Sequence, residues 1–366
     1  MIERIILFAL VLVNFIPAYS QNNKVSLLFA GDAMQHMPQV NAAKTADGYD
    51  YSDCFRQIQD RVKQTDIAVV NFETTLPGRR YSGYPMFGSP DAFAFALKDA
   101  GFDIFLTANN HSQDKGKLGV ERTIAILDSI QVKHLGSYVD KDKRDLLYPL
   151  MVVKNGIRIA MLNYTYDLNG LTAQHPNIIN LIDEKQMYDD IQMAKQLNPD
   201  IIITYMHWGE EYWLKPSKRQ KELADFLIKN GVRLVIGSHP HVVQPIDIQR
   251  DSDSIKNIVV YSLGNFISNQ SKPNTDGGMM VNIEISKDHN GNVNIDKCDY
   301  SLVWVYKHPE NGKNKYELLP VEKYDNENGK SVLGDKYWGN MQKFARNAKK
   351  TIESLWVKPE ETKAEN

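Results

Sequence analysis

The chain has 366 residues, of which 42% are hydrophobic and 24% are charged, a balance typical of a globular protein. This length suits one large α/β domain or two ordinary domains. The 43 basic and 45 acidic side chains give a net charge of −2. The sequence therefore has no basic surplus for binding nucleic acid, although a local pocket for an anion is compatible with this balance.

The first 20 residues differ in composition from the rest of the chain. An apolar run spans residues 5–16, and the small residues Ala18 and Ser20 stand three residues and one residue before Gln21. This pattern is typical of a secretory signal peptide. We expect residues 1–20 to direct export to the periplasm or the extracellular face of the cell envelope. The apolar run is shorter than the roughly 20 residues that span a bilayer, so we expect no transmembrane segment after cleavage.

Apolar runs in the first part of the chain predict buried strands at residues 25–30, 66–70 and 103–107. Each strand is followed by polar side chains of the kind that bind metals: Asp32, Glu73, Asn110 and His111. Taken singly, each of them is better explained by a structural role, and for Asp32 the capping of the following turn is an equally good explanation. Because strand ends meet at one edge of an open α/β sheet, we expect them to lie together.

Helices are predicted by apolar periodicity and by residues typical of helix ends. Ser89 and Pro90 indicate a helix with Ser as N-cap and Pro in the first position, ending near Gly101. Ser217 and Gln220 have capping-box spacing at the start of another helix. The remaining helices are expected at residues 117–130, 187–197 and 337–355.

The second part of the chain contains further strands with polar ends. Asn155-Gly156 predicts a hairpin between residues 150–153 and 157–164. A strand at 200–206 leads to His207, and one at 232–236 leads to Gly237-Ser238-His239-Pro240-His241. From residue 257 the pattern is mainly β, with strands expected at 258–262, 278–285 and 293–305.

The two histidines of the segment 237–241 follow a buried strand. The turn after a strand escapes the strict alternation of side chains, so both rings can point to one centre. Gly237 allows the backbone to turn, and Pro240 fixes φ between the rings. This predicts half of a metal site, although two surface histidines in a loop would also explain the pair.

Together, the strand ends carry carboxylate, amide and imidazole groups without a thiolate, which suits Zn, Mn or Fe. Glu73 has the chemistry to bridge two such ions, and His111 suits a general acid or an oxyanion stabiliser. Cys54 and Cys298 are too few for a cysteine-based zinc site, and their separation does not show whether they pair.

Several motifs, in this order, resemble the CapA family of bacterial poly-γ-glutamate capsule synthesis, within the calcineurin-like metallophosphatase superfamily. The resemblance covers about residues 25–306 and is carried by Gly31-Asp32, Asn71-Phe72-Glu73, Ala108-Asn109-Asn110-His111, His207-Trp208-Gly209, Gly237-Ser238-His239-Pro240-His241 and Ser262-Leu263-Gly264-Asn265-Phe266. It implies a layered α/β/β/α sandwich with mixed central sheets. We expect this domain to be followed by a polar C-terminal extension, residues 307–366, with a helix and a disordered end.

The resemblance also implies roles for the residues. One divalent ion would be held by Asp32 and His241, and a second by Asn110, His207 and His239, with Glu73 bridging them. His111 would be the acid beside the scissile group. We expect Asn265 and Gly264 to support the ligands through hydrogen bonds. Trp208 is a candidate for stacking on a substrate, with core packing as the alternative.

One position departs from the superfamily pattern. The first motif is usually Asp-x-His, and Met34 stands in place of the histidine, with His36 two residues further on as a candidate substitute. The first ion would then be weakly bound, differently ligated or absent.

The predicted function is an exported metal-dependent hydrolase or transferase. Its substrate would be an anionic envelope polymer or a precursor of one, cleaved at a phosphoester or a γ-glutamyl amide. The alternative is a non-catalytic, polymer-binding component of capsule synthesis or export machinery, and Met34 favours it.

Overall fold

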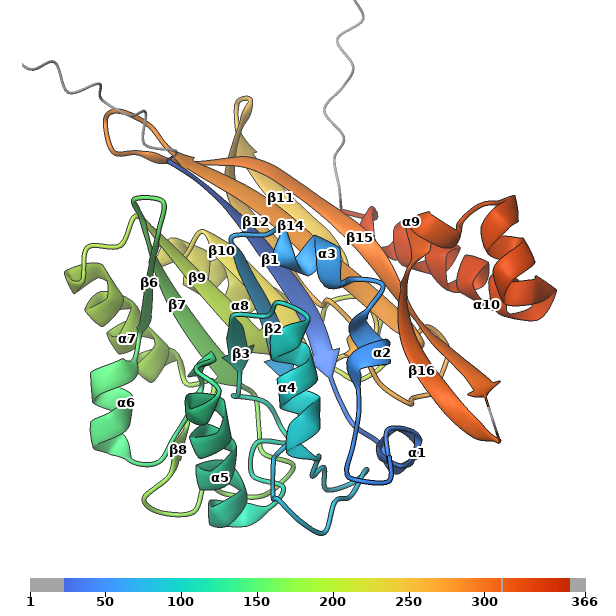
Figure 1. The fold of residues 1–366 in the computed structure, drawn as a ribbon. Helices are drawn as coiled ribbons and strands as arrows, with labels where there is room; N and C mark the ends of the chain where they lie inside the picture. The colour runs from blue at the N-terminus through green and yellow to red at the C-terminus, as the bar shows by residue number, and fades with distance from the viewer. Residues whose placement is uncertain (1–22, 311, 356–366) are drawn as a thin grey trace, which may run out of the picture.

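The computed structural model describes residues 23–310 and 312–355, so the expected signal peptide and the expected disordered end lie outside the described residues. Fourteen of the described strands form one hydrogen-bonded network. A single residue pair, Ile255 with Ile295, joins β12 to β15. This weak link divides the network into a first and a second half-sheet, which face each other (Figure 1).

The first half-sheet has parallel strands on one side and antiparallel strands on the other. A short strand, β13 (Asn265–Ile267), pairs with the end of β1. The other strands, in spatial order, are β4 (Lys133–Leu135), β3 (Ile104–Leu106), β2 (Ile67–Phe72), β1 (Lys24–Ala33), β14 (Gly277–Lys287), β15 (Val293–Glu310) and β16 (Lys313–Pro320).

The second half-sheet is parallel at its centre and antiparallel at both edges. Its strands, in spatial order, are β11 (Ile246–Asp251), β12 (Ser254–Val260), β10 (Leu234–Ser238), β9 (Ile201–His207), β7 (Ile157–Thr165) and β6 (Leu150–Lys154). A separate small sheet pairs β5 (Ser137–Tyr138) with β8 (Ile178–Ile179). The predicted hairpin is confirmed as β6 and β7, and Asn155 and Gly156 both have positive φ, as this turn requires.

Helices cover the outer faces of both half-sheets. The described helices are α1 (Met37–Ala42), α2 (Ser52–Phe55), α3 (Gln59–Lys63), α4 (Asp91–Asp99), α5 (Gly116–Ser129), α6 (Lys141–Leu147), α7 (Glu184–Gln196), α8 (Lys218–Lys229), α9 (Val321–Tyr324) and α10 (Glu327–Ile352). The expected layered α/β fold with mixed sheets is confirmed. Among the described residues, no helix is long and apolar enough to cross a membrane.

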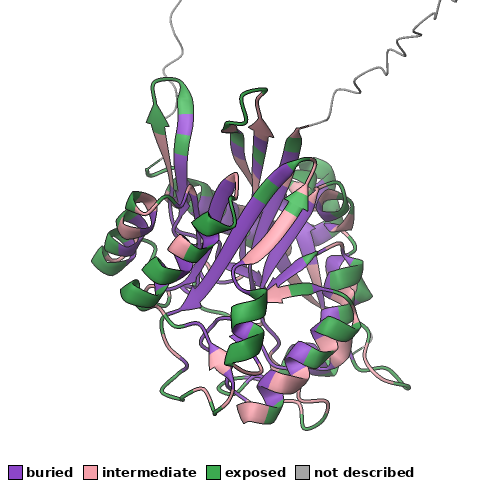
Figure 2. Cartoon of the chain, turned by 90° about the vertical axis from the view of Figure 1, so that its left-hand side faces the viewer, coloured by how far each residue is buried: buried purple, intermediate pink, exposed green. Residues whose placement is uncertain are grey.

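The largest core cluster includes residues of both half-sheets and extends to α7, α8 and α10. Leu27 and Phe29 of β1 join Ile203 of β9 and Leu234 of β10 in it. The central strands are buried along most of their length, and the exposed residues lie mainly on the outer helices and loops (Figure 2). Burial on both faces explains why the sequence of these strands is continuously apolar and does not alternate.

The predicted capping box of α8 is present, because Ser217 Oγ accepts from the Gln220 N–H and Gln220 Oε1 accepts from the Ser217 N–H. The predicted cap of α4 is wrong. Pro90 is the N-cap, and Ser89 Oγ instead forms a 2.7 Å hydrogen bond with Thr74 Oγ1. The hydroxyl is drawn to a neighbouring loop, so it does not satisfy the first turn of the helix.

The C-terminal part continues the first half-sheet. β15 crosses the expected boundary after residue 306, and β16 pairs with it. α10 lies along this edge on the right of Figure 1, and it buries Met341 and Phe344 in the largest core cluster. The helix expected at 337–355 begins earlier, at Glu327, and has a non-helical residue at Gly334. Cys54 and Cys298 are both free thiols.

Candidate metal centre

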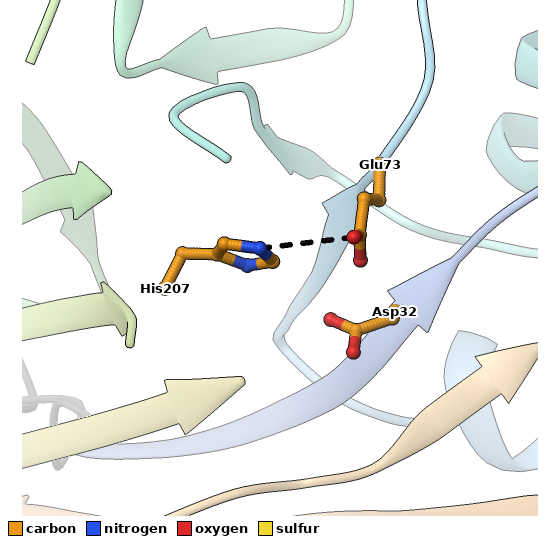
Figure 3. Close-up of side chains that lie close together, drawn as sticks. All are labelled: Asp32, Glu73 and His207. Carbon is orange, nitrogen blue, oxygen red and sulfur yellow. Dashed lines mark ion pairs between the residues drawn. The ribbon is translucent and has the colours of Figure 1, made fainter. Parts of the chain in front are cut away.

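The predicted polar strand ends meet at one edge of the fold. Asp32 lies near the end of β1, Glu73 directly follows β2, and His207 is the last residue of β9. Figure 3 shows these three side chains pointing toward one another. One ligand atom from each lies within 4.8 Å of the others, and His207 Nε2 is 3.7 Å from Glu73 Oε1. Two strands of the first half-sheet and one of the second therefore form a common site.

The other predicted ligands surround this group. Asn110 Oδ1 lies 2.8 Å from His207 Nε2. The His239 ring lies 4.8 Å from the His207 ring between centroids, and His241 Nδ1 lies 3.1 Å from Asp32 Oδ2. All six side chains predicted as ligands are therefore placed together, although their roles as ligands stay predictions.

The backbone around the site is closely packed and locally strained. A Cβ on Gly31 would lie 1.9 Å from the Gly264 carbonyl oxygen, and one on Gly237 would lie 2.1 Å from that of Tyr261. Glycine alone permits these contacts. His239 and His241 have φ values of 99° and 59°, which non-glycine residues rarely adopt. Such strain is typical of sites where side chains must point in one fixed direction.

Asp32 is held as a carboxylate by its neighbours. It is fully buried, and its Oδ1 accepts from Ser238 Oγ and, at 2.7 Å, from Asn71 Nδ2. Burial raises the pKa of Asp32. The hydrogen bond from His241, the nearby imidazoles and the Ser238 hydroxyl outweigh this effect and hold the pKa below its ordinary value.

Glu73 lies in the same site, but its Oε1 accepts no hydrogen bond from the described residues. Burial, followed by repulsion from Asp32, raises its pKa well above the ordinary value. Burial lowers the pKa of His207 to about 3, and burial together with neighbouring imidazoles lowers that of His239 well below the ordinary value. These imidazoles are therefore neutral near pH 7, the state in which a ring nitrogen can bind a metal.

The residues present fit a divalent cation. Glu73 Oε1 and His239 Nδ1 are buried and have no hydrogen-bond partner among the described residues. Two buried carboxylates repel each other, and neutral imidazoles do not compensate their charge. A divalent cation would both neutralise the carboxylates and occupy the unpaired lone pairs. The oxygen and nitrogen donors suit Zn, Mn or Fe.

His111 is oriented by a carboxylate. Its Nδ1 lies 2.7 Å from Asp114 Oδ2, which also accepts from the Phe87 N–H at 2.5 Å. The Phe87 ring packs against the imidazole in an edge-to-face arrangement, 4.4 Å between centroids. Asn110, the neighbour of His111, contacts His207, so the His111–Asp114 pair lies beside the ligand cluster.

The prediction that Trp208 stacks on a substrate is wrong. Its side chain is 1% exposed, and its indole N–H donates to the Tyr261 carbonyl at 3.0 Å. The alternation of side chains along β9 sends Trp208 to the opposite side from His207. Trp213 is 60% exposed, and Tyr166 packs on His239 at 4.4 Å between centroids. Tyr166, which is 42% exposed, is therefore an accessible aromatic ring in contact with the predicted ligands.

The predicted supporting residues lie next to Asp32. The Gly264 carbonyl accepts the Asp32 N–H at 3.0 Å, and Asn265 pairs with Asp32 across β1 and β13. The Asn265 side chain donates to Gln270 Oε1 and to the Thr275 carbonyl. Gly264 therefore fixes the Asp32 backbone directly, and Asn265 fixes the loop beyond it.

Neither Met34 nor its candidate substitute, His36, places a ligand atom in the group formed by Asp32, Glu73 and His207. Met34 is 1% exposed and packs in the interior. The candidate substitute, His36, packs on Phe87 at 5.1 Å between centroids, and its Nδ1 accepts from the Asn269 N–H at 3.3 Å. His36 therefore borders the site without joining the ligand group formed by Asp32, Glu73 and His207.

Three residues that hydrogen-bond to the predicted site residues were not assigned a role from the sequence. Asn71 donates to Asp32 and lies 3.3 Å from His207 Nδ1, Ser238 donates to Asp32, and Asp114 orients His111. A polar residue that interrupts the apolar end of a strand is a signal that would have found Asn71 and Ser238. The three-residue spacing from His111 would have suggested Asp114.

The fold and the site define a class of protein: a two-sheet α/β protein with a buried cluster of carboxylate, amide and imidazole side chains at the ends of its strands. A family model described as "Bacterial capsule synthesis protein PGA_cap" matches residues 26–270. The chain belongs to this family, as the resemblance to CapA proteins predicts.

Two relatives in Bacillus carry related names. The chain is 28% identical over 278 residues to the capsule biosynthesis protein CapA of Bacillus anthracis, covering 72% of this chain and 64% of that protein. It is 26% identical over 298 residues to the PGA biosynthesis protein CapA of Bacillus subtilis, covering 78% and 73%. The chain thus spans somewhat less than two thirds of the first relative.

A more distant similarity is to a solved structure. The NAD nucleotidase of Haemophilus influenzae aligns with a TM-score of 0.46 and 14% identity, covering 89% of this chain and 60% of that chain.

Proposed function

We propose that this protein is a metal-dependent hydrolase or transferase of capsule or poly-γ-glutamate synthesis. The observation that carries the proposal is the buried group of Asp32, Glu73 and His207 with unpaired ligand atoms on Glu73 and His239. Family membership and the names of the Bacillus relatives support the polymer pathway. The substrate would be an anionic envelope polymer or its precursor.

The residues divide into two working groups. Asp32 and His241 would hold one ion, Asn110, His207 and His239 a second, and Glu73 would bridge them. A bound ion supplies Lewis acidity, which activates a water nucleophile and stabilises charge on the scissile phosphoester or γ-glutamyl amide. His111, with Nδ1 directed to Asp114, keeps Nε2 as the ring atom that would hold a proton for the leaving group.

A second role is favoured by one residue. Met34 occupies the position where the superfamily has a ligand histidine, and its thioether is a poor ligand for a hard divalent ion. A site weakened in this way suits a non-catalytic component that binds the polymer within a synthesis or export assembly. Turnover distinguishes this role from the enzyme.

We also propose that the protein acts at the cell envelope after export. Residues 1–20 have the pattern of a signal peptide. The mature chain recovered from an envelope or secreted fraction should begin at Gln21 by N-terminal sequencing. Recovery of an uncleaved chain from the cytoplasmic fraction would contradict export.

The activity is tested on the Mn- or Zn-loaded protein with two substrates, a γ-linked glutamate oligomer and a phosphodiester with a nitrophenol leaving group. We expect His111→Asn to lower kcat for the cleaved substrate by roughly 10²-fold, because general acid catalysis contributes about that much. The metal content should be unchanged. His289→Asn, at an exposed turn, is the control. A wild-type protein that holds metal and cleaves neither substrate class would favour the assembly role.

A further inference from the structure

A basic groove lies beside the metal centre, between the loop of residues 269–276 and α10. It has a volume of about 400 Å³. Three lysines from three different segments line it: Lys272, Lys307 and Lys343. Trp304 of β15 and Tyr337 of α10 provide apolar walls. No role for this groove follows from the ligand cluster itself.

The positive charges in this groove are not neutralised. Among the described residues, none of the three lysines forms an ion pair with a carboxylate. Lys307 Nζ donates to Asn269 Oδ1 at 2.7 Å, and Lys272 Nζ lies over the Tyr212 ring at 3.6 Å. The groove therefore offers point charges to an anionic ligand.

One acidic residue, Asp276, lines the groove. Its Oδ2 accepts from Trp304 Nε1 at 2.9 Å. Burial raises the pKa of Asp276, and this effect outweighs the indole hydrogen bond and the Lys343 charge, both of which lower it. One carboxyl held by an indole does not cancel three ammonium groups, so the groove stays basic.

The groove is connected to the metal centre by direct contacts. Tyr212, which lies beneath Lys272, has its ring 6.0 Å from that of His241 and donates its N–H to the Pro240 carbonyl at 2.8 Å. Asn269, the partner of Lys307, donates its N–H to His36. One end of the groove therefore lies next to a predicted ligand of the metal.

The walls of the groove are held in place. Asn265, the β13 residue that pairs with Asp32, donates to Gln270 Oε1 at 2.9 Å and to the Thr275 carbonyl at 2.8 Å. Asn347 of α10 donates to Asn274 Oδ1 at 2.8 Å. A groove whose two walls are already joined loses little conformational entropy when a ligand binds.

We propose that this groove binds the carboxylates of a γ-linked glutamate polymer and directs the chain toward the metal centre. The three ammonium groups would pair with carboxylates of successive units, and Trp304 and Tyr337 would contact the methylene groups between them. The assignment of this polymer rests on the proposed function. The groove itself rests on its charge, its walls and its contact with the site.

The test is the affinity of the full mature protein for a fluorescently labelled γ-linked glutamate oligomer at low salt. We expect Lys272→Gln/Lys307→Gln/Lys343→Gln to weaken binding by roughly tenfold, because three charge contacts are lost. The control, Lys133→Gln/Lys221→Gln/Lys229→Gln, changes net charge equally at exposed lysines elsewhere and should bind within about twofold of wild type. If the triple variant does not fold, the double variant Lys272→Gln/Lys343→Gln, which changes only exposed residues, is measured in its place.

Added salt should weaken wild-type binding, and an uncharged γ-linked glutamine oligomer should bind poorly. Equal loss of affinity in the groove and control variants would overturn the proposal, as would absence of binding by the wild type. Tighter binding of a polyphosphate of equal charge would overturn the assignment to carboxylates.

A further variant separates the two proposals. His239→Ala/His241→Ala should lose metal and still bind the oligomer, because the lysines are intact. If the proposed function is wrong, the wild type will show no turnover, although oligomer binding still depends on the groove lysines. If the groove proposal is wrong, only the binding assay will show it, because the groove substitutions will not weaken binding.

Discussion

At the residue scale, two carboxylates in one site respond to burial in opposite ways. Asp32 accepts hydrogen bonds from Asn71 and Ser238 and a contact from His241, and its pKa is lowered. Glu73 has one oxygen without a partner among the described residues, and its pKa is raised. Glu73 therefore gains most from a bound cation, as a bridging ligand would.

The pKa of His36 gives a prediction about stability and pH. Burial is the largest effect and lowers the pKa of His36 to about 4, although Gln39 opposes it. Between the unfolded value near 6.5 and about 4, the unfolded chain binds a proton that the folded chain does not. His36 therefore stabilises the fold fully above this window, and that contribution is lost as pH falls through it. The protonated ring also cannot accept the Asn269 N–H.

We expect the metal-free protein to lose roughly 2 kcal/mol of unfolding free energy through His36 between pH 7 and pH 4.5. In denaturant titrations at the two pH values, His36→Gln should show a smaller loss than wild type. His289→Gln, at an exposed turn, should lose as much as wild type. An equal loss in wild type and His36→Gln would contradict this assignment.

At the scale of elements, the ends of the strands position the predicted ligands, and the sequence predicts where those ends lie. Strands buried on both faces have continuous apolar sequences, so β2, β9 and β10 and the ligands after them were found. The short helix α1 carries too few residues for a clear period, and β16 begins with the polar residues Lys313, Asn314 and Lys315, so both elements were missed. For Trp208 the sequence left stacking and core packing open, and the alternation of side chains after His207 decides for the core.

A substitution at Gly31 tests whether the site requires the close approach of β1 and β13. A Cβ here would lie 1.9 Å from the Gly264 oxygen, so β1 and β13 would have to separate and Asp32 would move with them. We expect Gly31→Ala to cost roughly 2 kcal/mol or more of unfolding free energy and to lower metal affinity. Gly48→Ala, whose added Cβ meets no atom within 4 Å, is the control. Unchanged stability and metal binding in Gly31→Ala would show that the approach is not required.

At the scale of the whole molecule, the sequence predicted the layered fold and the common edge but divided the chain differently at its end. The polar composition beyond residue 306 indicated a separate extension. In the structure, β16 joins β15 there, and Met341 and Phe344 of α10 are buried in the largest core cluster. An amphipathic helix buries only one face, so its average composition hides its contribution to a core.

Removing the buried ring of Phe344 tests whether α10 is part of the same core as the two half-sheets. We expect Phe344→Ala to lower the unfolding free energy by about 3–5 kcal/mol, because a large buried side chain is replaced by a cavity. Val332→Ala, at a residue of α10 that is 64% exposed, should change it by less than about 0.5 kcal/mol. Chemical denaturation should give a single transition for both. A separate early transition that Phe344→Ala alone shifts would mean that α10 unfolds as an independent unit.

The central claim is that the buried polar edge binds divalent metal. It is tested most directly by elemental analysis of protein purified without chelator, as wild type and as His239→Ala/His241→Ala, each after incubation with Mn, Zn or Fe. We predict about two equivalents of metal per chain in the wild type, or about one if Met34 has weakened the first position, and a clear loss in the double variant. Absence of metal from the wild type under all three conditions would contradict the account.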